Sequence, residues 1–155
     1  MIFTDEYFMN KALEQAQMAF EKNEVPVGVV IVHGNQIIAR AYNLTETLND
    51  VTAHAEMQAI TAAENYLGGK YLNDCTMYVT LEPCIMCVGA IIHARVERVV
   101  FGATDPKTGA PVSLYTIGSD DRLNHNFTIF GGILADKCSD LLKDFFRKKR
   151  KMRSV

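Results

Sequence analysis

Two cysteines and one histidine carry the clearest chemical signal in this sequence. Cys84 and Cys87 form a Cys-x-x-Cys pair directly after Pro83, and His54 lies well upstream of them. Thiolates and imidazoles are ligands that zinc prefers, and a catalytic zinc site commonly uses three protein ligands and leaves one position open. The sequence therefore predicts a zinc site made of His54, Cys84 and Cys87.

An acidic residue, Glu56, follows His54 by two positions. On a regular helix such residues point in nearly opposite directions, so both side chains can reach one metal ion only if His54 lies where the helix begins. Thr52 is a suitable N-cap for that helix. We expect Glu56 to transfer protons rather than to bind the metal.

Other readings of the cysteines remain open at this point. An isolated Cys-x-x-Cys pair can be a redox dithiol, and a structural zinc site would need a fourth Cys or His. Cys75 and Cys138 are available, but their positions before a strand and on an apolar helix face favour buried free thiols. The presence of both Cys84-x-x-Cys87 and His54-x-Glu56 favours a catalytic zinc site.

The surrounding pattern predicts alternating helices and strands. Apolar residues at helical spacing, β-branched runs and Gly/Asn turns mark these segments. The expected helices are 5–23, 52–67, 84–94 with Pro83 in its first turn, a short one at 113–117, and a last one from Leu134; the expected strands are 27–32, 36–42, 76–80, 96–101 and 127–130. This order implies a mixed five-stranded sheet covered on both faces, which is a three-layer α/β/α sandwich.

The size and composition fit one domain over residues 1–155. The apolar runs are too short to cross a bilayer, and the amino terminus has acidic residues and no basic segment of the secretory type. We therefore expect a cytoplasmic protein with no membrane partner.

Positive charge is concentrated at one end of the chain. The net charge is only −2, yet residues 147–155 hold six Lys or Arg and no acid. Such a basic helix end or tail can bind a polyanion such as nucleic acid, or it can simply complement a helix dipole in solvent. Charge alone does not separate these two readings.

The combination His54-Ala55-Glu56 with Pro83-Cys84-x-x-Cys87 resembles the signature of the zinc-dependent nucleoside and nucleobase deaminases. Longer segments resemble the bacterial tRNA-specific adenosine deaminases within that superfamily. These are Glu24-Val25-Pro26-Val27-Gly28, Ala53-His54-Ala55-Glu56, Tyr78-Val79-Thr80-Leu81-Glu82-Pro83-Cys84, Val99-Val100-Phe101-Gly102-Ala103 and Gly132-Ile133-Leu134-Ala135-Asp136. The resemblance covers nearly the whole chain.

The resemblance implies a cytidine deaminase-like fold and hydrolytic conversion of adenosine to inosine at the wobble position of a tRNA anticodon. The expected RNA is the anticodon stem-loop of an arginine tRNA. One zinc ion per subunit, held by His54, Cys84 and Cys87, would activate water, and Glu56 would shuttle protons. Members of this family are homodimers, so the resemblance also implies a homodimer.

The resemblance also implies substrate contacts. Matching positions are Asn43 and the Ala55 N–H near the nucleoside, Asp105, Asn124 and His125 near the flipped anticodon bases, and Phe145, Phe146 and Arg147 on the RNA-binding helix. Thr104, Asn126 and Pro111-Val112 depart from the family pattern.

Two alternatives compete with this reading. A deaminase of free guanine or cytosine would share the zinc ligands but would need no RNA surface, which the basic end argues against. A non-catalytic nucleic-acid-binding module would use zinc structurally, would need a fourth protein ligand and would have no use for Glu56.

Overall fold

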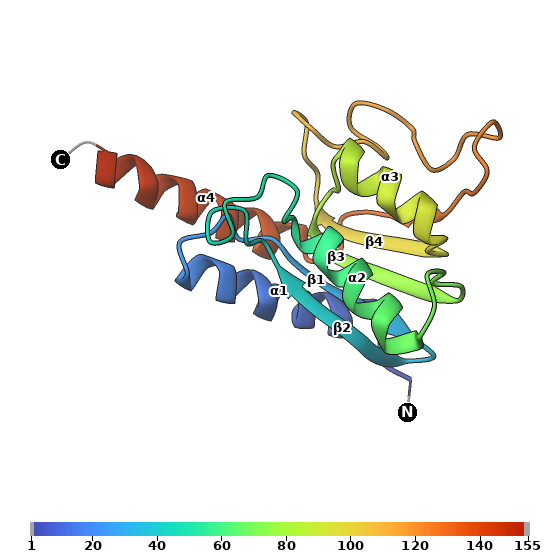
Figure 1. Ribbon diagram of the computed structural model, residues 1–155. Coiled ribbons are helices and arrows are strands. Elements are labelled where there is room, and N and C mark those ends of the chain that lie inside the picture. Colours follow the sequence, from blue (N-terminus) through green and yellow to red (C-terminus); the bar gives the residue numbers. More distant parts are fainter. Residues whose placement is uncertain (1, 154–155) are drawn as a thin grey trace.

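The computed structural model describes residues 2–153, and this range holds four helices and five strands (Figure 1). In chain order they are α1 (Asp5–Glu21), β1 (Gly28–His33), β2 (Gln36–Tyr42), α2 (Ala55–Leu67), β3 (Cys75–Leu81), α3 (Ile85–Ala94), β4 (Arg98–Ala103), β5 (Thr128–Phe130) and α4 (Ala135–Arg153). The predicted order of elements is confirmed. The short helix expected at 113–117 is wrong, because the backbone N–H groups of Val112 and Ser113 donate to the Glu82 carboxylate and the segment forms turns.

The strands form one mixed sheet in the order β2-β1-β3-β4-β5. β1 pairs antiparallel with both β2 and β3, whereas β3, β4 and β5 run parallel to one another. A parallel pair needs a crossover connection, and α3 supplies it between β3 and β4. The prediction of a mixed five-stranded sheet is confirmed.

Alternate residues of the central strands face opposite helical layers. Val29 and Ile31 of β1 belong to the core that includes α2 and α3. Val30 and Val32 belong to the core that includes α1 and Cys138 of α4. Because β1 is buried on both faces, it reads as a continuous apolar run rather than an alternating one. The three-layer α/β/α architecture follows from these two cores.

The starts of α2 and α3 differ from the sequence prediction by a few residues. Thr52 is not the N-cap of α2, because its N–H and hydroxyl both donate to the Asp50 carboxylate. His54 takes the N-cap position with an extended backbone (φ −65°, ψ 153°). Likewise Cys84 is the N-cap of α3 (φ −79°, ψ 174°), and Pro83 precedes it instead of lying in the first turn. Two metal-ligand candidates thus stand at helix starts.

Helix α4 contains most of the predicted basic end. It packs onto β4, where a Cβ at Gly102 would lie 2.3 Å from the Cys138 sulfur, and its carboxyl-terminal half extends beyond the sheet (Figure 1). The helix continues to Arg153, while residues 154 and 155 of the predicted tail lie outside the described residues. Within residues 2–153, none of the helices has the length and apolar character needed to cross a bilayer.

Candidate active site

His54, Cys84 and Cys87 meet in one place. The His54 Nδ1 atom lies 3.5 Å from the Cys87 sulfur and 3.7 Å from the Cys84 sulfur. Zinc bonds of about 2.3 Å to sulfur and about 2.0–2.1 Å to nitrogen, in a tetrahedral arrangement, imply nitrogen–sulfur separations of about 3.6 Å. The three side chains therefore fit a zinc ion as they stand.

The group contains no fourth protein ligand among the described residues. Cys75 and Cys138 are buried in the two cores and do not belong to it, so they are free thiols as predicted. Three ligands with one open position are typical of catalytic rather than structural zinc.

Both helix starts contribute to the chemistry of this group. The N-terminal ends of α2 and α3 carry partial positive charge from the helix dipole, which favours a thiolate at Cys84. A hydrogen bond from the Cys87 thiol, with a further one from His54, lowers the pKa of Cys84 to about 4 although burial opposes this shift. Donation to Cys84 correspondingly raises the pKa of Cys87.

The same hydrogen bonds affect how the group would bind a cation. The pKa of His54 is raised, mainly by its hydrogen bond to Cys84. Metal ligands must be deprotonated, so binding of a divalent cation here competes with protons on Cys87 and His54.

Glu56 lies in the first turn of α2 and is almost completely buried. Burial raises its pKa to about 7, while a hydrogen bond from its own backbone N–H and the charge of His54 act in the opposite direction. A carboxyl group whose pKa is close to neutral can both accept and donate a proton at physiological pH. The position and pKa of Glu56 suit a general acid and base beside the metal ligands.

A cavity of about 210 Å³ opens over these residues. It is smaller than the roughly 300–1,000 Å³ typical of pockets for drug-sized ligands, so it suits one planar base. Its walls come from the residues just before β1, the loop after β2, and the starts of α2 and α3. They consist of Val25, Val27, Asn43, Thr45, His54, Ala55, Glu56, Leu81, Glu82 and Cys84. The predicted residues Asn43 and Ala55 are thus part of this cavity.

Two residues without a role in the sequence analysis stand out beside the cavity. Glu24 and Glu82 are 0% and 2% exposed, and both accept hydrogen bonds from neutral groups of neighbouring loops. The sequence offers one signal for them, because each acidic residue lies one or two positions before a proline, Pro83 or Pro26, in an apolar context. Acidic residues are usually exposed, so this signal alone does not predict burial.

Asp105 is near this region but does not line the cavity. Its carboxylate accepts hydrogen bonds from the Lys107 and Thr108 N–H groups and from the Thr108 hydroxyl. The side chain therefore closes a turn, and its own N–H donates to Glu82. Asp105 therefore shapes the loop next to Glu82.

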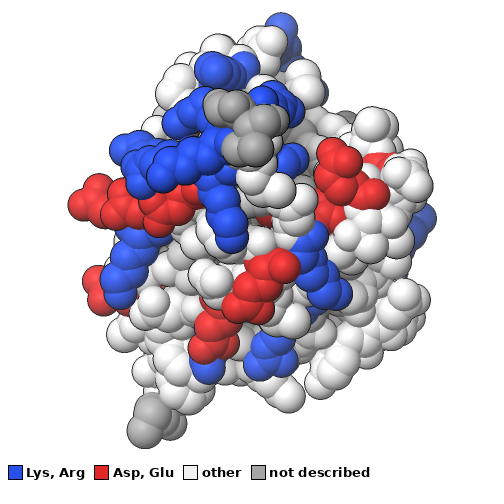
Figure 2. All heavy atoms as spheres, turned by 90° about the vertical axis from the view of Figure 1, so that its left-hand side faces the viewer, with Lys and Arg blue, Asp and Glu red and all other residues white. Residues whose placement is uncertain are grey.

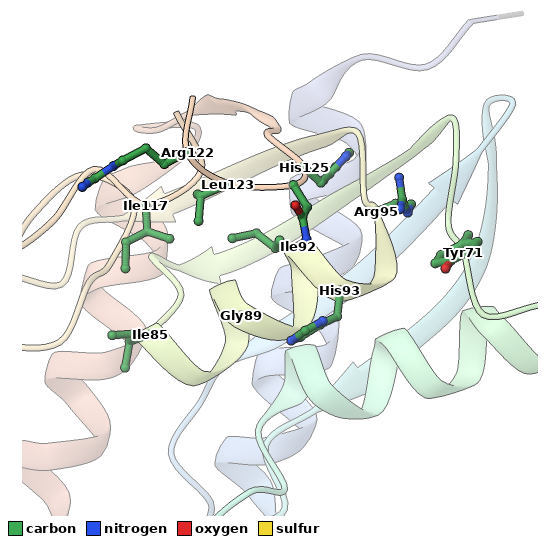
Figure 3. A pocket seen from close by; sticks show the side chains of 11 residues that line it. Tyr71, Ile85, Gly89, Ile92, His93, Arg95, Ile117, Arg122, Leu123 and His125 are labelled. Atoms are coloured by element: carbon green, nitrogen blue, oxygen red, sulfur yellow. The ribbon is translucent and has the colours of Figure 1, made fainter. Parts of the chain in front are cut away.

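Asn124 and His125 line a different cavity of about 540 Å³ beside α3. Figure 3 shows Ile92 of α3 extending toward the loop that carries Leu123 and His125, while Ile85 lines the same cavity at the start of the helix. The His125 Nε2 atom lies 2.7 Å from the Val96 carbonyl oxygen. The structure therefore does not bring Asn124 and His125 to the His54 site within one chain.

The aromatic pair on α4 is split between the interior and the surface. Phe145 is 3% exposed and packs edge-on against Phe20 and Phe146. Its ring is therefore part of the core, whereas the resemblance had implied a contact with RNA. The apolar stripe of α4 that holds Cys138 faces inward, and Phe145 continues it. Phe146 is 43% exposed, and Arg147 lies beside it with an ion pair to Asp144.

Basic side chains gather at the carboxyl-terminal end of the molecule. Figure 2 shows this face, with Lys and Arg concentrated in one region and acidic side chains beside it. A groove of about 760 Å³ runs along α4 there. Its lining consists of Lys107, Ser139, Leu142, Lys143, Phe146, Arg147, Lys149, Arg150 and Arg153. This composition suits a phosphate backbone with an adjacent base.

The mixed sheet, the His54-Cys84-Cys87 group that could bind a metal, and the buried Glu56 beside it together match the pattern of the hydrolytic deaminases. The model of the MafB19-like deaminase family matches residues 3–150. The chain belongs to this deaminase family.

Similar proteins narrow the relationship further. The tRNA-specific adenosine deaminase of Bacillus subtilis (strain 168) is 47% identical over 151 residues, which are 97% of this chain and 94% of that protein. The tRNA-specific adenosine deaminase of Aquifex aeolicus (strain VF5) is 48% identical over 145 residues, covering 94% and 95%. A solved structure from work on A-to-I editing by tRNA:A34 deaminases matches with a TM-score of 0.84 at 43% identity, covering 88% of this chain and 99% of that one. The predicted relationship to tRNA-specific adenosine deaminases is confirmed.

Proposed function

We propose that this protein converts adenosine to inosine at the wobble position of a tRNA anticodon. The observation that carries the proposal is the buried Glu56 beside the three candidate metal ligands, in a cavity suited to one base. The full-length similarity to tRNA-specific adenosine deaminases supports the substrate. In the reaction, water supplies an oxygen to C6 of adenine, the C6–N bond breaks and ammonia leaves.

We assign zinc as the metal of this site, one ion per subunit. The nitrogen–sulfur distances and the mixed imidazole and thiolate ligands support this assignment. When bound, zinc supplies a Lewis acid that activates water at neutral pH. His54, Cys84 and Cys87 would hold it, and His54 and Cys84 line the cavity.

The remaining chemistry belongs to side chains of the cavity. Glu56 takes a proton from the attacking water and passes it to ring N1. It then takes the remaining proton of the hydroxyl group added at C6 and gives it to the amine, which leaves as ammonia while C6 becomes a carbonyl. The Asn43 amide and the Ala55 N–H orient the nucleoside, and both residues line the cavity. The apolar walls formed by Val25 and Val27 exclude bulk water from the base.

The RNA partner is the anticodon stem-loop, and an arginine tRNA is the proposed substrate. The groove on α4 supports stem contacts through Arg147 and stacking through Phe146. Asp105 acts through the loop that it closes. Asn124 and His125 lie away from the His54 cavity, so they would contact anticodon bases only at a surface formed by two subunits.

A homodimer supplies such a surface. Ile85 on α3 is 58% exposed beside the apolar cavity that holds Ile92 and Leu123, and a second copy would bury this face (Figure 3). As a tRNA-modifying enzyme, the protein would act in the cytoplasm.

The test is a single-turnover assay of zinc-loaded protein on an anticodon stem-loop with adenosine at the wobble position. Free adenosine, cytosine and guanine are assayed in parallel. Glu56→Ala is compared with Glu64→Ala, which changes another α2 glutamate away from the cavity. We expect inosine only in the stem-loop, lost in Glu56→Ala and retained in Glu64→Ala. Ammonia from a free base without editing would overturn the proposal, and RNA binding without turnover would favour a structural module.

A further inference from the structure

We propose that Glu24 and Glu82 are positioning residues that fix the two loops flanking the base-binding cavity. Burying a carboxylate is costly unless hydrogen bonds replace its water. In each case the replacement donors come from one loop. The ion pairs of the described residues include neither carboxylate, and the charge of Lys149 contributes to lowering the pKa of Glu24 less than the hydrogen bonds do. The kinetic part of this proposal rests on the proposed function, and the structural part does not.

Glu24 holds the loop that follows β2. Its carboxylate accepts the Glu46 N–H at 3.1 Å, the Thr47 N–H at 2.6 Å and the Thr47 hydroxyl at 2.5 Å. Asn43 and Thr45, just before these donors, line the cavity. Glu24 therefore fixes the backbone from which this wall of the cavity extends.

Glu82 holds the loop between β4 and β5 against the metal-ligand segment. Its carboxylate accepts the N–H groups of Asp105 at 3.0 Å, Val112 at 3.0 Å and Ser113 at 2.8 Å, and also the Ser113 hydroxyl. Glu82 itself lines the cavity, two residues before Cys84. One side chain thus ties this loop to the start of α3.

The loop between β4 and β5 packs tightly around the Glu82 carboxylate. A Cβ at Gly109 would lie 2.3 Å from the carboxylate carbon, which is closer than real Cβ contacts occur. Gly109 also forms a β-bridge with Cys84, and the Ala110 N–H donates to the Pro83 carbonyl at 3.0 Å. Release of Glu82 would therefore loosen the backbone beside a metal ligand.

Replacing Glu24 or Glu82 with glutamine tests whether the carboxylate acts by accepting hydrogen bonds or only by filling space. Glutamine keeps the shape of glutamate but replaces one acceptor oxygen with an NH₂ donor, which would face the N–H groups of the loop. The matched control is Asp5→Asn. Asp5 is a hydrogen-bonded carboxylate bound by Arg98 and Tyr78, and its partner Tyr78 belongs to the opposite core from the cavity.

The experiment measures amide hydrogen exchange by mass spectrometry, zinc content, and kcat and KM on the anticodon stem-loop. We expect Glu24→Gln to raise exchange in 44–50 only and Glu82→Gln to raise it in 105–113 only. We expect KM in Glu24→Gln to rise about tenfold, equivalent to about 1.4 kcal/mol, with zinc content unchanged. Asp5→Asn should lower the melting temperature without changing KM.

Several outcomes would overturn the proposal. One is unchanged exchange in both loops, another is exchange raised throughout the chain, and a third is an equal kinetic loss in Asp5→Asn. If a glutamine variant does not fold, Thr47→Ala and Ser113→Ala remove one hydroxyl donor from each loop and give the same comparison. A wild type that edits no stem-loop would defeat the proposed function, while the exchange data would still decide whether the glutamates fix the loops.

Discussion

The Nδ1 atom of His54 and the sulfur of Cys87 lie 3.5 Å apart although 33 positions separate the two residues in the chain. The pKa values of His54 and Cys87 are both raised, in each case mainly by a hydrogen bond to Cys84. We predict that zinc binding at neutral pH releases protons, since metal ligands must be deprotonated. Calorimetric titration in two buffers with different ionisation enthalpies measures this release. Binding heats independent of the buffer would contradict it, and Cys87→Ser should weaken the binding itself.

Replacing Glu56 should separate activity from stability. We predict that Glu56→Gln lowers kcat by a factor of about 10²–10⁴, the usual contribution of a positioned acid or base. Burial raises the pKa of Glu56 from 4.5 to about 7 in the metal-free chain, so the folded state binds this proton more tightly than the unfolded state. Stability from this group is complete below about pH 4.5 and is lost as the pH rises through about 7.

The raised pKa of Glu56 predicts how the stability of the variant should depend on pH. At about pH 8, metal-free Glu56→Gln should be more stable than the wild type by about 1–3 kcal/mol in urea unfolding, and the difference should shrink at about pH 5. If Glu56→Gln and the wild type were equally stable at both pH values, burial would not perturb the pKa of the Glu56 carboxyl group.

The pair of Asp5 and Arg98 should make the fold sensitive to acid. The Arg98 guanidinium, 2.6 Å from the Asp5 carboxylate, holds the pKa of Asp5 below its usual 3.8, with a further hydrogen bond from Tyr78. A lowered pKa gives stability that is present above the unfolded value and is lost as the pH falls through the folded one. We predict that Asp5→Asn destabilises the protein at neutral pH and that this difference narrows below about pH 3.8. Urea unfolding of both proteins across this range measures it, and a difference independent of pH would exclude an ionic contribution.

Two glycines should respond to alanine in opposite directions. A Cβ at Gly28 would lie 2.1 Å from the Ala12 carbonyl oxygen and 2.4 Å from the Ala16 nitrogen, both backbone atoms of α1. Gly28→Ala should therefore cost about 1–3 kcal/mol, as expected for overpacking. Gly89, inside α3, has open space around its Cβ position, so Gly89→Ala should stabilise the monomer by up to about 1 kcal/mol. Thermal unfolding of the two variants compares them directly, and an equal effect would argue against the close approach of β1 and α1.

Charge on α4 should control how RNA affinity depends on salt. We predict that Arg147→Gln reduces the slope of log affinity against log salt by about 0.7–0.9, the contribution of one phosphate contact. Lys11→Gln serves as the control, because Lys11 lies on α1 and pairs with Glu14. Fluorescence anisotropy with a labelled stem-loop at several salt concentrations gives both slopes. Equal slopes for the two variants would remove the groove on α4 from the RNA-binding surface.

The metal ligands and the fold could be predicted from the sequence because local signals specify them. A Cys-x-x-Cys pair at a strand-to-helix transition and a His-x-Glu at a helix start each restrict geometry within a few residues. The order of elements followed from periodicity, and the sheet followed from that order. The N-cap of α2 was misplaced because Thr52 is a residue type that favours helix starts, whereas in the structure Thr52 bonds to the Asp50 carboxylate and His54 takes the N-cap position.

Long-range contacts could not be predicted in this way. Periodicity did not show that Glu82 would bind the loop at Val112 and Ser113, so a helix was expected there instead of turns. Phe145 and Phe146 are adjacent in the sequence, and only the packing against Phe20 makes one of them core and the other surface. Similarly, the separation of His125 from the His54 cavity depends on how residues 117–125 lie beside α3.

The end of α4 has a consequence for the order of the helix itself. Arg147 and Lys151, and likewise Lys149 and Arg153, lie one turn apart and carry like charges. Such pairs destabilise a helix by a few tenths of a kcal/mol each, which offsets the benefit of cations near its carboxyl end. Phosphates that neutralise these side chains would remove the repulsion, so the last turns of α4 should gain helical order when RNA binds. Part of the recognition surface would then be completed by the substrate, and the cost of ordering it would be subtracted from the binding free energy.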